Sequence, residues 1–128
     1  MVKKPFIYIA GPITKGDHPV NIRNGIDAFD HIARLGGIPF CPMFDFLYRM
    51  VYPDGMSYDA LLDYDKQIIL RCDAVMRLPG ESKGADIEEK FAKENHIPFF
   101  VDWEALAMWI INYGQEKSNR KECCGYSD

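Results

Sequence analysis

The feature that most constrains the fold is an uninterrupted apolar run near the N-terminus. The run spans Phe6 to Ala10 (FIYIA), and Gly11-Pro12 follows it directly. A strand that exposes one face alternates apolar and polar residues, whereas a strand buried on both faces is apolar nearly throughout. The run therefore predicts a central strand of a sheet that is covered on both sides.

Strand-like and helix-like segments alternate along the rest of the sequence. Apolar residues recur at helical spacing before Gly36-Gly37, which predicts a helix over about 20–36. The same patterns predict further helices over 58–71, 84–95 and 103–112, and further strands over 38–41, 74–78 and 97–101. Residues 42–57, rich in Phe, Tyr and Met, are expected to form a long loop.

This alternation is typical of βαβ units, which build parallel sheets. We predict an α/β fold of three layers, similar to the Rossmann and flavodoxin folds, with a parallel sheet of about four to five strands. The expected strand order is 2-1-3-4, which places the ligand-binding crevice beyond the ends of strands one and three. We expect a single domain over 1–112 and a polar, flexible tail over 113–128.

The composition excludes several classes of protein. Fifteen Lys and Arg against nineteen Asp and Glu give a net charge of −4, too acidic for binding nucleic acid chiefly through its phosphates. The longest apolar run, Ala105 to Ile111, is too short to span a bilayer, and Gly11-Pro12 interrupts any signal-peptide core. We expect a soluble cytoplasmic domain whose partners are neither a nucleic acid polymer nor a membrane.

The cysteines and histidines do not predict a metal site. Cys41 and Cys72 are isolated in apolar surroundings, where a small buried side chain is the usual interpretation. Cys123 and Cys124 are adjacent in the polar tail and lack a second pair at metal-ligand spacing. The three histidines are scattered, so we expect no metal, disulfide framework or other cofactor.

Two acidic residues occupy the apolar faces of predicted helices. In the helix over 84–95, Glu88 lies at the centre of the apolar face, one turn from Gly84 and Ala92. In the helix over 58–71, Asp65 lies at the centre of the stripe formed by Leu61, Leu62, Ile68 and Ile69. A buried charge is costly unless it has a partner or a task. Either residue alone is compatible with an ion pair or a cleft edge, but together they can supply a nucleophile and an acid for glycosidic-bond cleavage.

Further candidates lie near the same predicted crevice. Tyr8 is the polar member of the first strand, and its hydroxyl can reach a carboxylate or simply be satisfied in the core. Ser82, Lys83 and Gly84 precede a helix, where Ser82 can cap the helix and free N–H groups can hold an anion. The loop GPITKG matches neither GxGxxG nor the P-loop. Asp45, in the aromatic segment, is expected to be exposed.

The motifs taken together resemble the nucleoside 2-deoxyribosyltransferase superfamily, which includes the 2′-deoxynucleoside 5′-monophosphate N-glycosidases. The resemblance covers roughly residues 5–101. It rests on Tyr8-Ile9-Ala10-Gly11-Pro12-Ile13, on Asp65 with Asp73, and on Ser82-x-Gly84-x-x-x-Glu88.

The resemblance implies a role for each of these residues. Glu88 is the expected nucleophile at the anomeric carbon, Tyr8 orients it, and Asp65 protonates the departing base. Asp73 is expected to support the substrate site from its strand, and the loop Gly11, Pro12, Ile13 and Thr14 to pass close to the sugar. Ser82 resembles the position that binds a 5′-phosphate in the nucleotide hydrolases, and with Lys83 and Gly84 it favours a 5′-monophosphate.

This sequence departs from the family in two places, and the alternatives stay open. Lys90 stands where the family often has Gly, and Pro12 stands where the nucleotide hydrolases tend to have Ser. The resemblance implies a homodimer or higher homo-oligomer. We expect an N-glycosidic hydrolase or deoxyribosyltransferase that acts on a deoxynucleoside or its 5′-monophosphate. The alternatives are a non-catalytic nucleotide-binding module and an interaction protein that uses segment 42–58 and the Trp103–Trp109 helix.

Overall fold

The computed structural model describes residues 2–13 and 15–123 of the 128-residue chain, and it has the predicted α/β architecture. Within the described residues, one sheet contains β1 (Phe6–Ala10), β2 (Ile38–Phe40), β3 (Ala74–Arg77) and β4 (Phe99–Phe100). All pairs are parallel and the order is β2-β1-β3-β4, which confirms the predicted order. The helices are α1 (His18–Leu35), α2 (Met43–Val51), α3 (Tyr58–Ile69), α4 (Lys83–Glu94) and α5 (Trp103–Cys123).

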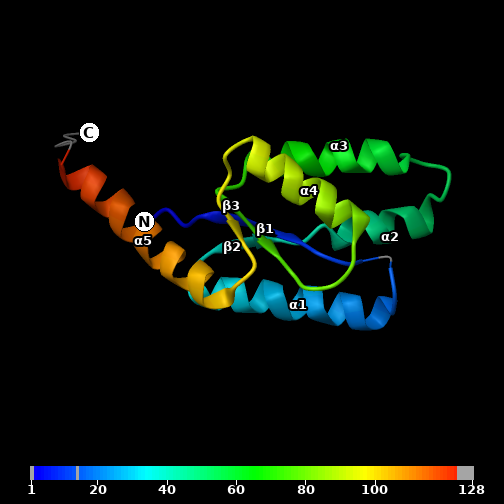
Figure 1. Cartoon of the computed structure of the whole chain (residues 1–128), viewed down its shortest axis with the longest axis horizontal. Coiled ribbons are helices and arrows are strands. Elements are labelled where there is room, and N and C mark those ends of the chain that lie inside the picture. The colour runs from blue at the N-terminus through cyan, green and yellow to red at the C-terminus, as the bar shows by residue number, and fades with distance from the viewer. Residues whose placement is uncertain (1, 14, 124–128) are drawn as a thin grey trace.

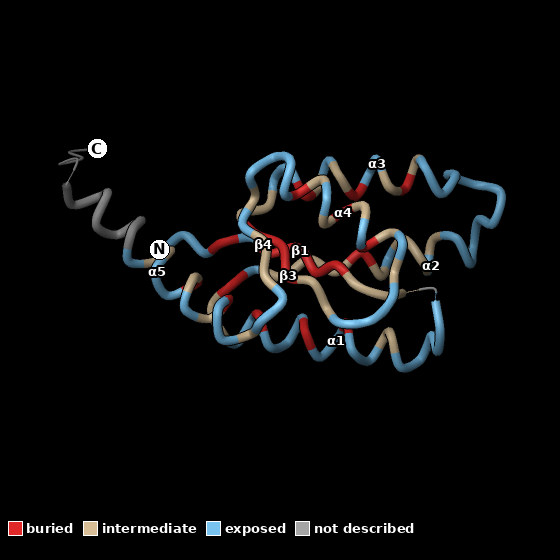
Figure 2. Tube along the Cα trace, in the orientation of Figure 1, coloured by how far each residue is buried: buried red, intermediate tan, exposed pale blue. Residues whose placement is uncertain are grey.

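The helices cover both faces of the sheet and so form three layers. Figure 1 shows α1 on one side of the strands and α3 and α4 on the other, with α5 beside the α1 layer. Figure 2 shows buried backbone concentrated in the central strands and in the helix turns that face them. β1 lies between β2 and β3, so it is fully paired, as its apolar run predicts.

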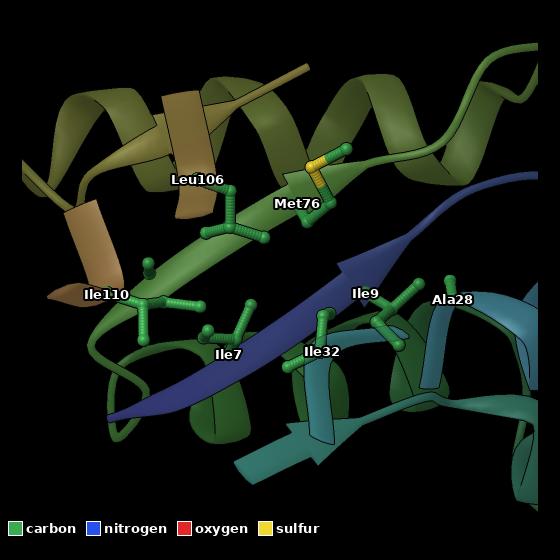
Figure 3. Packing of buried hydrophobic residues seen from close by; sticks show 8 residues of the cluster. Ile7, Ile9, Ala28, Ile32, Met76, Leu106 and Ile110 are labelled. Carbon is green, nitrogen blue, oxygen red and sulfur yellow. The ribbon is translucent and has the colours of Figure 1, made fainter. Parts of the chain in front are cut away.

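Alternating side chains of the central strands build two separate cores. The core between the sheet and helices α1 and α5 contains Ile7, Ile9, Ala28, Ile32, Ala74, Met76, Leu106 and Ile110 (Figure 3). The core between the sheet and helices α3 and α4 contains Tyr8, Ala10, Ile69, Val75, Ala85 and Ala92. This alternation places the Tyr8 side chain on the face of the sheet that α3 and α4 cover. These two helices carry the candidate residues Asp65 and Glu88.

Segment 42–57 differs from its prediction because much of it is helical. Helix α2 begins after Pro42 and runs to Val51, so the expectation of a long loop was wrong. The helical stretch contains neither glycine nor proline, and Asp45 lies in its first turn, where a negative charge favours a helix. Residues 52–57 alone connect α2 to α3.

Two other elements differ in length from their predictions. β4 is restricted to Phe99–Phe100 because the backbone N–H of Ile97 bonds to Ala92 at the end of α4, and Pro98 has no N–H. The last helix continues through Cys123, beyond the predicted end at residue 112, because residues 113–123 contain no proline and several strong helix formers. Residues 124–128, the rest of the predicted tail, lie outside the described part.

Over the described ranges, none of the helices combines the length and the apolar character needed to span a bilayer.

Candidate functional site

A cavity of about 550 Å³ opens at the C-terminal edge of the central strands. The loops that leave β1 and β3 form part of its wall, and helices α2, α3 and α4 form the rest. Ligands of open parallel sheets bind at this edge, because the strand ends there leave room between the connecting loops. Most of the residues predicted for the site line the cavity: Gly11, Ile13, Asp65, Ser82, Lys83, Gly84 and Glu88.

Glu88 is buried at the floor of this cavity. It is 5% exposed, although it belongs to a helix whose opposite face is solvated. Its Oε2 atom accepts a 2.5 Å hydrogen bond from the hydroxyl of Tyr8 in β1. Burial raises the pKa of Glu88 to about 7, while the hydrogen bond from Tyr8, the contact with Asp65 and the charge of Arg77 act in the opposite direction. Glu88 therefore ionises near neutral pH.

Tyr8 is suited to remain a hydrogen-bond donor. Its side chain is fully buried on the face of the sheet that α3 and α4 cover, and its ring stacks on Phe40 with centroids 5.7 Å apart. Burial raises the pKa of Tyr8 well above its ordinary value, and the charge of Glu88 raises it further. The phenol therefore stays protonated and holds the Glu88 carboxylate in one orientation, as the sequence predicted for a Tyr8–carboxylate contact.

Asp65 is the second buried acid of the cavity. It lies on α3, is 7% exposed, and has one oxygen, Oδ1, that is buried without a hydrogen-bond partner. Burial raises the pKa of Asp65 to about 9, with further contributions from its hydrogen bond with Asp45 and from the charge of Glu88. Between these two pKa values, at about pH 8, Asp65 is therefore largely protonated while Glu88 is largely ionised. The cavity thus brings together the two buried acidic residues that the sequence placed on apolar helix faces.

The N-terminus of α4 forms another part of the wall. Ser82 caps the helix, with its Oγ accepting a 3.1 Å hydrogen bond from the N–H of Ala85. Lys83 and Gly84 follow on the cavity side, and a Cβ at Gly84 would lie 3.3 Å from the Tyr58 hydroxyl oxygen. A helix N-terminus with a hydroxyl and a nearby ammonium group favours an anion. The arrangement is therefore complementary to a phosphate or carboxylate group on a ligand.

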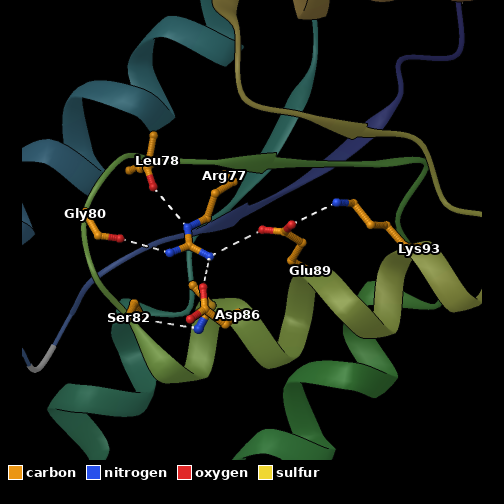
Figure 4. A network of polar contacts seen from close by, with 8 residues as sticks. Arg77, Leu78, Gly80, Ser82, Asp86, Glu89 and Lys93 are labelled. Atoms are coloured by element: carbon orange, nitrogen blue, oxygen red, sulfur yellow. Dashed lines mark hydrogen bonds and ion pairs between the residues drawn. The ribbon is translucent and has the colours of Figure 1, made fainter.

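Arg77 holds the loop between β3 and α4 in place (Figure 4). Its side chain is 11% exposed and donates hydrogen bonds to the backbone oxygens of Leu78 (3.1 Å) and Gly80 (2.9 Å). It also pairs with Asp86 at 2.8 Å and with Glu89 at 3.6 Å, both on α4. Gly80 has a φ of 117°, and a Cβ there would lie 2.7 Å from Pro12. Arg77 and Gly80 together determine the path of the loop that leads from β3 to Ser82 at the start of α4.

The structure does not bring every predicted residue to the cavity. Pro12 instead lines a separate cleft of about 300 Å³ on the α1 side, together with His31 and Trp103. Asp73 precedes β3 at the opposite edge of the sheet, where its Oδ2 accepts a 2.8 Å hydrogen bond from the N–H of Phe6. Thr14 lies outside the described residues. The placement of Asp73 fits the pairing of β1 with β3, and its predicted substrate-binding role receives no support from its location.

Sequence analysis missed the contribution of α2 to the site. Asp45, expected to be exposed, lies on the cavity wall with a buried Oδ2 that has no hydrogen-bond partner, and Arg49 lies one turn further along. The signal available in the sequence was the i, i+4 spacing of Asp45 and Arg49 in a stretch without glycine or proline. Lys15 also lines the cavity, and its 2.6 Å salt bridge with Glu81 joins the two strand-end loops. In the described part of the chain, no group of three or more His, Cys, Asp or Glu residues is arranged to hold a metal ion.

The fold and the site together define the class of protein: a three-layer α/β domain with two buried carboxyl groups at the C-terminal edge of a parallel sheet. Residues 5–101 match the family described as a domain of unknown function, DUF4406, and the chain belongs to this family. The matched region contains every strand of the sheet and all of the cavity residues named above. No curated protein matches the sequence.

Proposed function

We propose that the protein cleaves the N-glycosidic bond of a deoxynucleoside or its 5′-monophosphate, with Glu88 as the nucleophile. The observation that carries this proposal is the pairing of Glu88 with Asp65 in one cavity, in which burial and mutual contact favour opposite protonation states. The resemblance of Tyr8, Asp65, Ser82 and Glu88 to the nucleoside 2-deoxyribosyltransferase superfamily supports the same chemistry. Each of these residues contacts the cavity or the nucleophile.

In the first step, a carboxylate oxygen of Glu88 attacks C1′ of the sugar. The C1′–N bond breaks, and its electron pair leaves with the base. The proton of the Asp65 carboxyl group goes to the departing base, so the base leaves neutral and Asp65 becomes a carboxylate. The product of the step is a glycosyl ester of Glu88. Tyr8 holds the attacking carboxylate toward C1′ throughout.

In the second step, a nucleophile resolves the ester. For hydrolysis, the Asp65 carboxylate takes a proton from water, the resulting hydroxide attacks C1′, and the ester electrons return to Glu88. Both carboxyl groups then have their starting protonation states. For transfer, a second base takes the place of water and gives its proton to Asp65. The atoms and charges balance with these two residues alone.

A 5′-monophosphate is the substrate that the cavity wall favours. Ser82, Lys83 and the N-terminus of α4 supply hydroxyl, ammonium and N–H donors on one side. Lys15 approaches the same loop through its salt bridge with Glu81. A volume of about 550 Å³ is within the range of small-molecule sites and accommodates a nucleotide.

The test is release of free base from a panel of deoxynucleosides and their 5′-monophosphates. We expect Glu88→Gln to abolish release, and Glu94→Gln, an exposed residue of the same helix, to leave it unchanged. Incubation with a 2′-fluoro substrate analogue, whose glycosyl ester hydrolyses slowly, should add the sugar mass to the peptide that contains Glu88. If no substrate of the panel releases base, or if Glu88→Gln releases as much as wild type, the proposal is wrong. Stabilisation by a nucleotide without product would instead indicate a binding module.

We also propose that the protein is a homo-oligomer whose contact involves α2. Phe44, Met50, Val51 and Tyr52 are each more than half exposed, and Met50 also lines the cavity. A second copy that covers these apolar side chains would narrow the cavity mouth. Sedimentation velocity should give a dimer or larger for wild type and a smaller species for Val51→Lys. Val101→Lys, at an exposed position after β4, is the control. A cytoplasmic location stays a prediction.

A further inference from the structure

Asp45 has a buried oxygen that the scheme above does not use. Its Oδ2 atom and Oδ1 of Asp65 are the buried side-chain oxygens without a hydrogen-bond partner among the described residues. Both side chains line the cavity, and the contact with Asp45 contributes to the raised pKa of Asp65. Asp45 comes from α2 and Asp65 from α3, so two helices converge to place these carboxyl groups together.

The charges around this pair do not neutralise it. Among the described residues, neither Asp45, Asp65 nor Glu88 forms a salt bridge within 4.0 Å. The cations that line the same cavity are Lys15, which pairs with Glu81, and Arg49 and Lys83.

The other titratable groups near Asp45 and Asp65 are Glu88 on α4, the phenols of Tyr8 and Tyr58, and the thiol of Cys41. The charge of Glu88 contributes to the raised pKa of Cys41. Two ionised aspartates beside an ionising glutamate would therefore repel one another strongly.

One proton shared between the two aspartates would remove both the unpaired buried oxygens and the repulsion between two ionised carboxylates. A protonated carboxyl group donates to a carboxylate, so the hydrogen bond satisfies one buried oxygen on each residue. The shared proton also leaves a single negative charge on the pair in place of two. An unpaired buried acceptor otherwise costs about 1–3 kcal/mol, and an unpaired buried charge costs more.

We propose that Asp45 and Asp65 share one proton and that Asp45 is a positioning residue that keeps Asp65 in its proton-donating form. The catalytic half of this inference rests on the proposed function, and the proton sharing does not. When Asp65 gives its proton to the departing base, both aspartates become carboxylates, and their repulsion makes Asp65 a stronger base. Asp65 therefore readily takes a proton from water or from the second base in the next step, which restores the shared proton.

The first test follows the carboxyl carbons of the full chain by carbon-13 NMR as the pH is raised. In wild type, the carbons of Asp45 and Asp65 should each respond in the same two steps, because the proton belongs to the pair. Asp45→Asn should shift the titration of Asp65 to lower pH by about one unit or more, since the amide donates to ionised Asp65 and carries no charge. Asp54→Asn, at an exposed position after α2, is the matched control.

The second test measures kcat for base release as a function of pH. In Asp45→Asn the basic limb of the kcat profile should shift to lower pH by the same amount as the NMR titration, which loss of structure alone would not produce. Independent single-step titration of the two aspartates in wild type overturns the inference, and this measurement needs no variant. An unchanged Asp65 titration in Asp45→Asn also overturns it. Failure of base release with the expected NMR result contradicts the proposed function and leaves proton sharing established.

Discussion

The hydroxyl of Tyr8 donates a 2.5 Å hydrogen bond to Oε2 of Glu88, which joins the central strand to α4 across 80 positions of sequence. Both side chains are at most 5% exposed, so the bond forms where water does not compete with it. Because the phenol stays protonated, it stabilises the ionised form of Glu88 and opposes the effect of burial. The contact thus determines both the orientation and the charge of the proposed nucleophile.

Tyr8→Phe should therefore slow the reaction and displace its pH dependence. The wild-type rate should rise with pH as Glu88 ionises near 7 and fall as Asp65 loses its proton near 9. Loss of the donor raises the pKa of Glu88, so the acid limb moves to higher pH. A hydrogen bond to a charged group contributes about 1.5–3 kcal/mol, so kcat/KM should fall about 10- to 100-fold. Tyr64→Phe, at an exposed position of α3, should change neither quantity. An unshifted acid limb in Tyr8→Phe would show that the bond does not control ionisation.

The stability of the protein should decrease as the pH rises from weakly acidic to basic values. The pKa of Asp65 is about 9 in the folded chain and near its ordinary value of 3.8 when the chain is unfolded. Between these values the folded state binds more protons than the unfolded state, so the free energy of unfolding falls with increasing pH. Asp65→Asn removes the contribution of Asp65 to this dependence, while that of Glu88 remains. Urea unfolding should show the variant roughly 1–3 kcal/mol more stable than wild type near pH 8, and little different near pH 4. Asp63→Asn, exposed on the same helix, serves as the control, and parallel pH curves for Asp65→Asn and wild type would contradict the prediction.

The sheet and the two principal acids could be predicted because local sequence determines them. A five-residue apolar run without alternation requires cover on both faces, and β1 has it. Glu88 and Asp65 interrupt apolar helix faces, and such interruptions can be identified from spacing alone. The cap at Ser82 likewise depends on residues within one turn.

The remaining features depend on tertiary packing that the local pattern does not contain. In α2, apolar residues recur at helical spacing, but Phe44 and Leu47 are exposed, so the apolar face of this helix is not fully buried within the chain. Asp45 reaches the cavity because α2 forms part of the cavity wall together with α3. Asp73 lies just before β3, whereas the cavity lies at the C-terminal end of this strand. The length of β3 therefore separates Asp73 from the cavity, although Asp73 is near the cavity residues in sequence.

Arg77→Met should loosen the loop that leads into α4 and so affect both stability and ionisation of the site. The change removes hydrogen bonds to Leu78 and Gly80 and the salt bridges to α4, at a cost of about 1–3 kcal/mol in the free energy of unfolding. It also removes a positive charge that lowers the pKa of Glu88, so the acid limb of the rate profile should move to higher pH. Asp86→Asn is the matched control, because it weakens one exposed salt bridge and keeps both carbonyl contacts, costing about 0–1 kcal/mol. Equal losses in the two variants would show that the carbonyl contacts do not stabilise the loop.

Ser82→Asp should separate the capping role of Ser82 from its role in binding a 5′-phosphate. Aspartate caps a helix as well as serine does, and its charge suits a helix N-terminus, so thermal unfolding should be unchanged or slightly raised. The same charge repels a phosphate beside Lys83, so KM for the 5′-monophosphate should rise about tenfold or more, with a smaller change for the nucleoside. Ser57→Asp makes the same exchange at the cap of α3, where Ser57 accepts from the N–H of Ala60, and should leave both KM values unchanged. An equal change in KM for nucleoside and monophosphate would place the phosphate elsewhere in the cavity.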